Sequence, residues 1–384
     1  MRIAVIHSFY SSRTVSGENI VVQGQIAALK NKGHAVELFA RYTDREEQRR
    51  TYGLRSTLRV ITGYGFNFKR ELKHFDPDLI LVHNLFPNIS TRWLERVKVN
   101  RIVFLHNFRP WCSNGFMLRN GKSCQKCLRN PLWGSFYRCA NGSFARSLVQ
   151  SFGQVFNYNL KRLEKSGAKI VAVSKYSQNK ISEFSNLRDV GVLSNFISFK
   201  GNSDLSGSDD QGFPNKKFVW AGRISTEKGL ADLLDIWPTA YSLDIFGTGP
   251  DLAGLKEIHG GKTNISFKGS INNDKLMAEL PKYTGFVNSS TWSEFAPMSI
   301  IEALSIGLPI VFPNGISLGE LLTNFNAGEA FVLRDSESLR KSLERLSDLK
   351  EHEKYVESAL RLFTIEFSFE GWYEKLLSIN ASMK

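Results

Sequence analysis

The sequence predicts an α/β protein with two Rossmann-like, doubly wound domains. Short apolar segments alternate with helical segments along the whole chain, and one stretch rich in Gly, Ser, Asp and Asn divides this series into two parts. At 384 residues the chain is longer than one hydrophobic core usually organises. Strands that alternate with helices favour parallel sheets covered by helices, and two such domains place a cleft between the carboxyl ends of their strands.

The first domain, residues 1–197, opens on an apolar strand at residues 2–7. A polar loop leads to a helix at about residues 19–31, because Val22, Ile26 and Leu29 recur at helical spacing. Gly33 is a good residue to end this helix. Further strands are predicted at residues 35–40, 79–82, 101–105 and 169–173.

Residues 198–216 have the composition of a surface linker. The second domain, residues 217–365, is predicted to contain strands at 217–221, 243–246, 265–267, 286–287 and 310–312. We expect residues 366–384 to form a C-terminal helix that packs back on the first domain. The residues after Arg2 lack the order of a signal peptide, and no run reaches membrane-spanning length, so a cytoplasmic location is expected.

The net charge of +13 is concentrated in one region. No Asp or Glu lies between Glu95 and Glu164, whereas the basic residues there are Arg96, Lys98, Arg101, Arg109, Arg119, Lys122, Lys126, Arg129, Arg138, Arg146, Lys161 and Arg162. Aromatic residues are interleaved with them. This composition suits an anionic partner such as acidic lipid, a lipid-linked pyrophosphate or nucleic acid, and a plain solvated basic face is the alternative.

The same region contains every cysteine of the chain, within an insertion at about residues 107–146. The cysteines are Cys112, Cys124, Cys127 and Cys139, with a central Cys-x2-Cys pair. In a reducing compartment this clustering favours a structural zinc over disulfides, and cysteines that only pack in the core are the alternative. A catalytic metal is not expected, because four thiolates leave no open coordination position.

Two glutamates flank a predicted helix N-terminus in the second domain. Glu294 lies in the loop before the helix and Glu302 lies inside it, while Pro297 suits the helix start and Gly307 its end. A helix N-terminus carries unpaired N–H groups and suits a phosphate. Carboxylates on either side of it suit a ligand with hydroxyl pairs at both ends of a diphosphate. Two ordinary surface carboxylates are the alternative.

Glycines and cations follow the neighbouring strands. Gly222 allows a tight turn after the strand at 217–221, and Arg223 and Lys228 follow where a diphosphate would lie. Gly247 provides a second turn that a ligand could approach. In the first domain, Gly17 lies in the first strand-to-helix turn.

Two further strands of the first domain are each followed directly by a histidine and an asparagine. These pairs are His83 with Asn84 and His106 with Asn107. Ligands bind at the carboxyl ends of parallel strands, so both histidines are candidates for a role in one cleft, and a structural hydrogen-bonding role is the alternative.

The order Gly-Arg-x3-Glu-Lys-Gly, Glu-x7-Glu and Gly-x-Pro, after an N-terminal glycine turn and strand-end histidines, resembles family 4 glycosyltransferases of the GT-B fold. The resemblance spans the whole chain. The cysteine-containing insertion resembles the branch found in bacterial exopolysaccharide and O-antigen synthesis.

The resemblance implies retaining, metal-independent transfer of a hexose from a nucleotide-sugar, with no cofactor needed for catalysis. It assigns Arg223 and Lys228 to the diphosphate, Glu302 to the ribose and Glu294 to the sugar. His106 would lie near the anomeric carbon. Donor contacts would come from Gly17, Gly222, Gly247 and the backbone of Phe295, Ala296, Pro297 and Met298. The acceptor side would comprise His83, Asn84, Asn107 and Arg109.

The expected acceptor is a lipid-linked oligosaccharide, held at the anionic inner leaflet of the membrane by the basic region. Two departures from the family pattern bear on donor choice: Ser16 replaces the first glycine of a pair, and Ala296 or Pro297 stands where relatives often have glycine. Asp76 and Asp78 precede a strand, so we interpret them as strand-entry residues and not as a metal-binding pair. Nucleic acid is not expected as a partner.

Two other functions remain open at this stage. A zinc-containing nucleic-acid-binding protein would explain the basic region but would leave the paired glutamates without a role. A GT-B nucleotide-sugar hydrolase or epimerase would keep the donor site and change the reaction.

Overall fold

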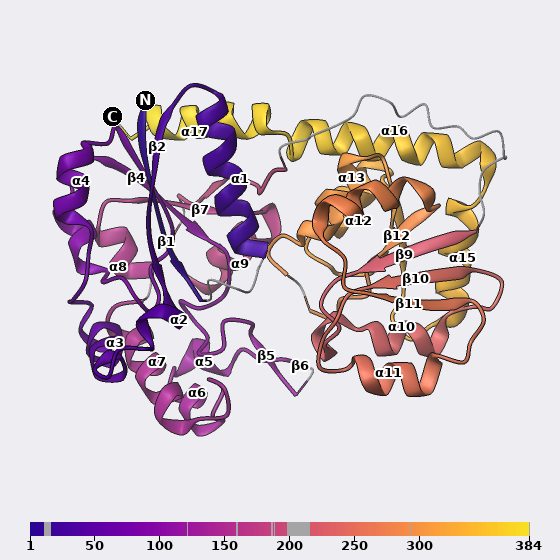
Figure 1. The fold of residues 1–384 in the computed structure, drawn as a ribbon, viewed down its shortest axis with the longest axis horizontal. Coiled ribbons are helices and arrows are strands. Elements are labelled where there is room, and N and C mark those ends of the chain that lie inside the picture. Colours follow the sequence, from indigo (N-terminus) through magenta and orange to yellow (C-terminus); the bar gives the residue numbers. More distant parts are fainter. Residues whose placement is uncertain are drawn as a thin grey trace. The chain divides into compact units, whose positions relative to one another are not determined.

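Two compact α/β units make up the chain, one formed by residues 1–195 with 372–384 and the other by residues 196–371. The computed structural model describes residues 1–10, 17–120, 122–158, 160–185, 187, 189–197, 216–292 and 294–383. Each unit contains a six-stranded sheet with helices packed around it (Figure 1). The predicted α/β class with two parallel sheets is confirmed. Residues 198–215 of the expected linker lie outside the described part of the chain.

The first sheet has the strand order β2-β1-β3-β4-β7-β8, and all its pairs are parallel. Its central strands are buried on both faces; Ile3, Val5 and Leu81, for example, have no exposed surface. Parallel strands covered by helices on both faces read as continuous apolar runs. The bounds are β1 Arg2–Phe9, β2 Ala35–Tyr42, β3 Leu79–Asn84, β4 Asn100–Leu105, β7 Lys169–Ala172 and β8 Gly191–Val192.

The helices of this unit begin with α1, Gly17–Asn31, which matches the helix predicted at about residues 19–31. Asp78 accepts a hydrogen bond from the Arg2 backbone N–H at the entry to β3, which confirms that it is a strand-entry residue. The other helices are α2 Thr43–Glu46, α3 Tyr52–Thr62, α4 Lys69–Phe75, η1 Arg92–Arg96, α5 Lys126–Arg129, α6 Trp133–Phe136, α7 Phe144–Phe156, α8 Leu160–Lys165 and α9 Lys175–Phe184. A short hairpin, β5 Leu118–Arg119 with β6 Lys122–Ser123, lies in the insertion.

The second sheet has the order β11-β10-β9-β12-β13-β14, also entirely parallel. Its strands are β9 Lys217–Ala221, β10 Ser242–Phe246, β11 Ile265–Gly269, β12 Gly285–Val287, β13 Ile310–Pro313 and β14 Gly328–Phe331. Sequence reasoning found five of these and missed β14, as it missed β8 in the first unit. Both are edge strands of at most four residues without an apolar run.

The helices of the second unit are α10 Leu230–Ile236, α11 Leu252–His259, α12 Asn273–Glu279, α13 Met298–Ser305, α14 Gly319–Phe325, α15 Ser336–Leu346 and α16 Leu349–Glu366, with the short turns η2 Thr226–Lys228 and η3 Leu280–Lys282. The last helix, α17 Phe369–Ala381, continues into the first unit. There His34 Nε2 lies 2.8 Å from the Tyr373 hydroxyl, and Asn100 Nδ2 donates to Asn380 Oδ1 at 2.9 Å. Within the described residues, no helix has the length and apolar character needed to cross a membrane.

Candidate functional site

In the second unit, the loops that follow β9 and β10 pack backbone against backbone. The Gly222 N–H donates to the Phe246 carbonyl and the Ile224 N–H to the Thr248 carbonyl, both at 3.0 Å. Gly247 has a φ of +150°, and a Cβ there would lie 1.9 Å from the Gly222 carbonyl oxygen. Gly247 is therefore required by the contact between two loops. Sequence reasoning explained this glycine by ligand approach, and its donor-binding role stays a prediction.

A third loop, after β12, brings Glu294 to Lys228. Gly229 adopts a left-handed conformation against the Ser289 carbonyl, and the Thr291 N–H donates to the Glu227 carbonyl at 3.2 Å. Lys228 Nζ then lies 2.6 Å from Glu294 Oε1. The two side chains are 26% and 18% exposed. Glu294 is thus held in a half-buried ion pair, and its interpretation as a solvated loop residue is wrong.

Arg223 has a different environment on the same edge of the sheet. Its side chain is exposed directly after β9, beside the Gly222 turn. Among the described residues, no carboxylate lies within ion-pair distance of its guanidinium, whereas Lys228 is paired with Glu294. Arg223 therefore presents an uncompensated charge where a parallel sheet ends, which suits an anionic ligand.

Helix α13 starts after Pro297, which is buried and extended, so the first N–H groups of the helix lack intrahelical partners. Phe295 is buried in the core, so only its backbone can face a ligand. Ala296 and Met298 are partly exposed.

Glu302 lies one turn into α13 and is only 9% exposed. It accepts a hydrogen bond from Asn273 Nδ2 at 2.8 Å, and burial raises the pKa of its carboxyl. A surface-charge role for Glu302 is therefore wrong. A buried carboxylate with spare acceptor capacity is what hydroxyl recognition requires.

In the first unit, one cavity collects the strand-end residues that the sequence singled out. A space of about 80 Å³ is lined by His83, Asn84, His106, Asn107 and Arg109, among other residues. His83 Nδ1 lies 2.9 Å from His106 Nε2, so the two histidines share a hydrogen bond. Arg109 is held over the Phe86 ring, its Cζ 4.4 Å from the ring centroid. Gly17 is exposed at the start of α1.

The histidines around this cavity are neutral at physiological pH. Burial lowers the pKa of His106 to about 3 and that of His7 to about 4. Burial, together with the two neighbouring histidines, also lowers the pKa of His83. These rings can therefore exchange hydrogen bonds but do not supply positive charge.

Sequence reasoning missed Glu18, which lines the same cavity. Burial raises the pKa of its carboxyl to about 7, against the opposing charge of Arg109. Glu18 directly follows Gly17 in the first turn of α1. Acidic residues are common there because they interact favourably with the helix dipole, so the sequence alone offered no reason to single it out. Only the fold shows that it faces a cavity.

The four cysteines have free thiols, and Cys112 and Cys127 are buried. Burial and the other three cysteines raise the pKa of Cys127. Among the residues that the structure describes, no group of three or more His, Cys, Asp or Glu side chains is arranged to hold a metal ion. The structural zinc at Cys112, Cys124, Cys127 and Cys139 stays a prediction.

Comparison with known families identifies the fold and the general activity. A family model described as "Glycosyltransferase Family 4" matches residues 15–199, and one described as "Glycosyl transferases group 1" matches residues 209–362. The chain belongs to the family 4 glycosyltransferases. A search of curated proteins found no match.

Solved structures of other glycosyltransferases confirm the GT-B fold. Sucrose-phosphate synthase from Thermosynechococcus elongatus aligns over 100% of this chain and 98% of its own, with a TM-score of 0.67 and 15% identity. Anabaena HepE in complex with UDP-glucose aligns over 100% of both chains, with a TM-score of 0.62 and 16% identity. WaaG, a glycosyltransferase involved in lipopolysaccharide biosynthesis, aligns over 99% of both chains, with a TM-score of 0.57 and 12% identity.

The contact at Gly247 predicts that this glycosyltransferase does not tolerate a side chain there. Gly247→Ala should lower the free energy of unfolding by about 2–4 kcal/mol, because the methyl group meets backbone that cannot move aside. Gly254→Ala, in α11 with no atom within 4 Å of its Cβ position, is the control and should be neutral or stabilising. Urea denaturation measures both, and equal stability of the two variants would contradict this account.

Glu18 predicts a pH-dependent stability. Its pKa is raised from 4.5 to about 7 on folding, so its favourable contribution is complete below pH 4.5 and is lost as the pH rises through about 7. Glu18→Gln should therefore gain stability relative to the parent protein between pH 5 and pH 8.5, by roughly 1–3 kcal/mol. Thermal unfolding across this range is the measurement, with the exposed Glu37→Gln as control. A difference that does not change with pH would refute the assignment.

Proposed function

We propose that this protein is a retaining hexosyltransferase that uses a nucleotide-diphosphate sugar and acts in surface polysaccharide synthesis. The observation that carries the proposal is the group of side chains at the carboxyl edge of the second sheet: exposed Arg223, the Lys228–Glu294 pair, and buried Glu302 in the helix whose N-terminus opens there. HepE, one of the similar structures, has been solved with UDP and with UDP-glucose, which supports a nucleotide-sugar donor.

The donor's parts match the chemistry of these groups. The diphosphate would take Arg223, Lys228 and the free N–H groups at the start of α13 as donors. Lys228 would then be shared between Glu294 and the phosphate, so that Glu294 is left beside the sugar hydroxyls. Glu302 would accept hydrogen bonds from the ribose hydroxyls while it keeps the hydrogen bond that Asn273 donates to it.

Catalysis in this proposal is mainly positioning and charge stabilisation. The acceptor oxygen bonds to the anomeric carbon on the face from which the nucleoside diphosphate leaves, so the anomeric configuration is kept, and the hydroxyl proton passes to the departing diphosphate. The arginine and lysine neutralise the charge that develops on the leaving diphosphate, and the transfer needs no metal ion. His106, which is neutral, would lie near the reacting carbon as a hydrogen-bonding group.

The proposed acceptor is a lipid-linked saccharide at the inner face of the membrane. Support comes from a surface on the first unit where α7 packs against α3 and α6 (Figure 1). We call it the aromatic-basic surface. Its exposed apolar residues are Leu54, Leu58, Leu132, Trp133, Phe136, Phe144, Phe152 and Phe156, and its exposed cations are Lys122, Lys126, Arg129, Arg138 and Arg146. Aromatic and basic residues together suit an anionic lipid surface.

One of the similar structures is a glycosyltransferase of lipopolysaccharide synthesis. WaaB is described as a lipopolysaccharide outer core galactosyltransferase and aligns over 100% of both chains, with a TM-score of 0.61 and 15% identity. A likeness at this identity shows the fold alone, so the polysaccharide role of this chain is proposed from the exposed aromatic and basic residues of its first unit.

Turnover should depend on Arg223. With a donor selected by thermal shift from a panel of nucleotide-sugars, Arg223→Ala should lower kcat by at least a hundredfold, about 2.7 kcal/mol, because the charge that stabilises the leaving group is lost. Lys256→Ala, an exposed lysine on α11, is the control. A loss of less than tenfold would remove the assigned role.

Product analysis completes this test. An NMR spectrum showing an inverted anomeric centre would contradict retention. Sugar released or isomerised at the same rate without acceptor would favour a hydrolase or an epimerase.

Membrane binding should depend on the aromatic-basic surface. Phe136→Asp should reduce flotation with vesicles that contain phosphatidylglycerol, because Phe136 is 70% exposed and packs against Trp133, whose ring Lys126 contacts. Ile258→Asp on α11 is a matched control, since Ile258 is also 70% exposed but lies in the second unit. Charge reversal at Arg129 and Arg138 should have the same effect as Phe136→Asp. Equal flotation of all variants would refute the surface.

A further inference from the structure

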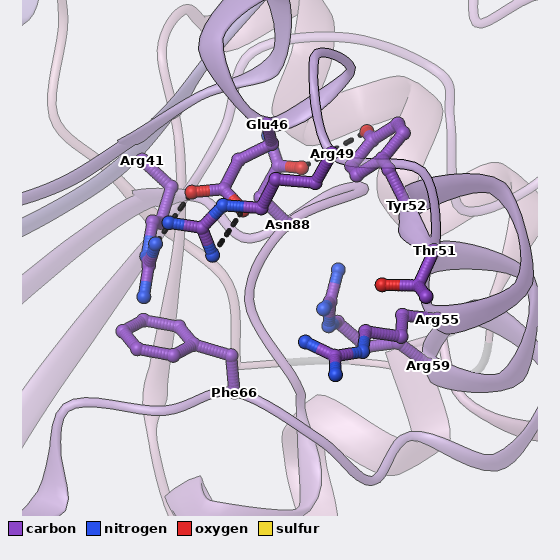
Figure 2. Close-up of a pocket in the computed structure, with 9 residues that line it drawn as sticks. All are labelled: Arg41, Glu46, Arg49, Thr51, Tyr52, Arg55, Arg59, Phe66 and Asn88. Atoms are coloured by element: carbon purple, nitrogen blue, oxygen red, sulfur yellow. Dashed lines mark hydrogen bonds and ion pairs between the residues drawn. The ribbon is translucent and has the colours of Figure 1, made fainter.

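We infer that the first unit contains a dedicated phosphate-binding pocket, separate from the donor site, that holds the phosphoryl groups of the acceptor. This inference rests on the proposed function for the identity of the ligand as an acceptor. The pocket lies at the carboxyl ends of β2 and β3 and is lined by Arg41, Glu46, Arg49, Thr51, Tyr52, Arg55, Arg59, Phe66 and Asn88 (Figure 2).

Positive charge dominates this pocket. Arg41 and Arg49 both pair with Glu46, the one carboxylate among its lining residues. Within the described part of the chain, neither Arg55 nor Arg59 has a carboxylate within ion-pair distance. Arginine forks match the oxygens of a phosphate, and the two unpaired guanidinium groups supply them.

Arg59 forms the buried floor of the pocket. It is 9% exposed, its Nη1 donates to the Pro87 carbonyl at 3.0 Å, and its buried Nε has no hydrogen-bond partner. Burial also lowers the pKa of this guanidinium. A desolvated cation without a carboxylate in direct contact is costly, and a bound anion would relieve that cost.

The walls are held rigidly. Arg41 stacks on Phe66, its Cζ 3.5 Å from the ring centroid. The Tyr52 hydroxyl donates to Asn88 Oδ1 at 3.0 Å, and Asn88 Nδ2 donates to Ser8 Oγ and Thr43 Oγ1 at 3.0 and 2.8 Å. Figure 2 shows Arg55 and Arg59 on the α3 side of the space, opposite Arg41 and Phe66. Such preorganisation reduces the ordering needed when a ligand binds.

The size of the space fits a phosphorylated molecule larger than inorganic phosphate. The pocket itself has a volume of about 80 Å³. It shares Arg41, Glu46, Arg49 and Phe66 with an adjoining depression of about 430 Å³, which adds Arg45 and Glu71. A diphosphate can thus occupy the cationic end while the rest of the acceptor extends beyond it.

Position links this pocket to the histidine cavity of the same unit. The loop after β3 contributes Phe86 to the histidine cavity and Asn88 to the arginine pocket. Helix α3 contributes Arg55 and Arg59 to the pocket and exposes Leu54 and Leu58 on the aromatic-basic surface. A lipid diphosphate bound here would therefore have apolar surface nearby for its chain and strand-end residues nearby for its saccharide.

Calorimetric titration of the full chain with inorganic pyrophosphate tests the inference, with saturating UDP present to occupy the donor site. Arg55→Ala should weaken pyrophosphate binding at least tenfold, or 1.4 kcal/mol, because an unpaired guanidinium is lost. Arg50→Ala is the matched control, since Arg50 is exposed on the same segment and lines neither space. The affinity of the Arg50→Ala variant for pyrophosphate should stay within twofold of that of the parent protein.

A second variant tests the role of Arg59 at the floor of the pocket. Arg59→Lys keeps the charge but removes the fork, so it should also weaken pyrophosphate binding, with an unchanged circular dichroism spectrum and unfolding midpoint showing that the first unit is folded. Equal binding by Arg55→Ala and Arg50→Ala, or pyrophosphate binding that saturating UDP abolishes, would overturn the pocket. Failure of the parent protein to bind UDP would count against the proposed donor, and pyrophosphate would then report on the pocket alone.

Two phosphorylated ligands distinguish the source. Farnesyl diphosphate that binds more tightly than pyrophosphate, with the gain lost in Leu58→Asp, would identify a lipid-linked acceptor. Glucose 1-phosphate that binds as tightly as farnesyl diphosphate would identify a free phosphorylated sugar.

Discussion

Burial of the parallel strands on both faces is the constraint on which the rest of this structure depends. Strand interiors such as β1 and β3 are apolar and have almost no exposed surface, so polar and charged side chains cannot lie within the sheets at low cost. They gather where the strands end. The arginine pocket, the histidine cavity and the Lys228–Glu294 pair all lie at or just beyond carboxyl strand ends.

The two units differ in which charged groups lie at these sheet edges and in how those groups are paired. In the second unit the two candidate site carboxylates have partners, Lys228 for Glu294 and Asn273 for Glu302, while Arg223 is left exposed. In the first unit the histidines around the cavity are neutral and arginines supply the charge. A nucleotide-sugar has both hydroxyls and phosphates, so it suits the second unit, where carboxylates and cations lie together. A phosphorylated acceptor suits the first unit, where arginines dominate.

Much of the fold follows from local sequence patterns. Long buried strands appear as continuous apolar runs, and β9 begins and ends where the sequence predicted. The edge strands β8 and β14 could not be found this way, because pairing with a neighbour and not an apolar run makes them strands. Gly247 shows a similar limit: its presence in a turn was clear, but its reason is a carbonyl from a loop 25 residues earlier in the chain.

The sequence by itself determined the α/β class, the strand-end motifs, the family and the concentration of positive charge, since each of these is written in local composition and spacing. Only the tertiary structure decided which of these groups meet. Lys228 pairs with Glu294 across 66 positions, His83 binds His106, Glu18 faces a cavity, and arginines from β2 to α3 surround one space. Such contacts depend on how loops from separate strands pack at one edge of a sheet, and no periodicity along the chain encodes that packing.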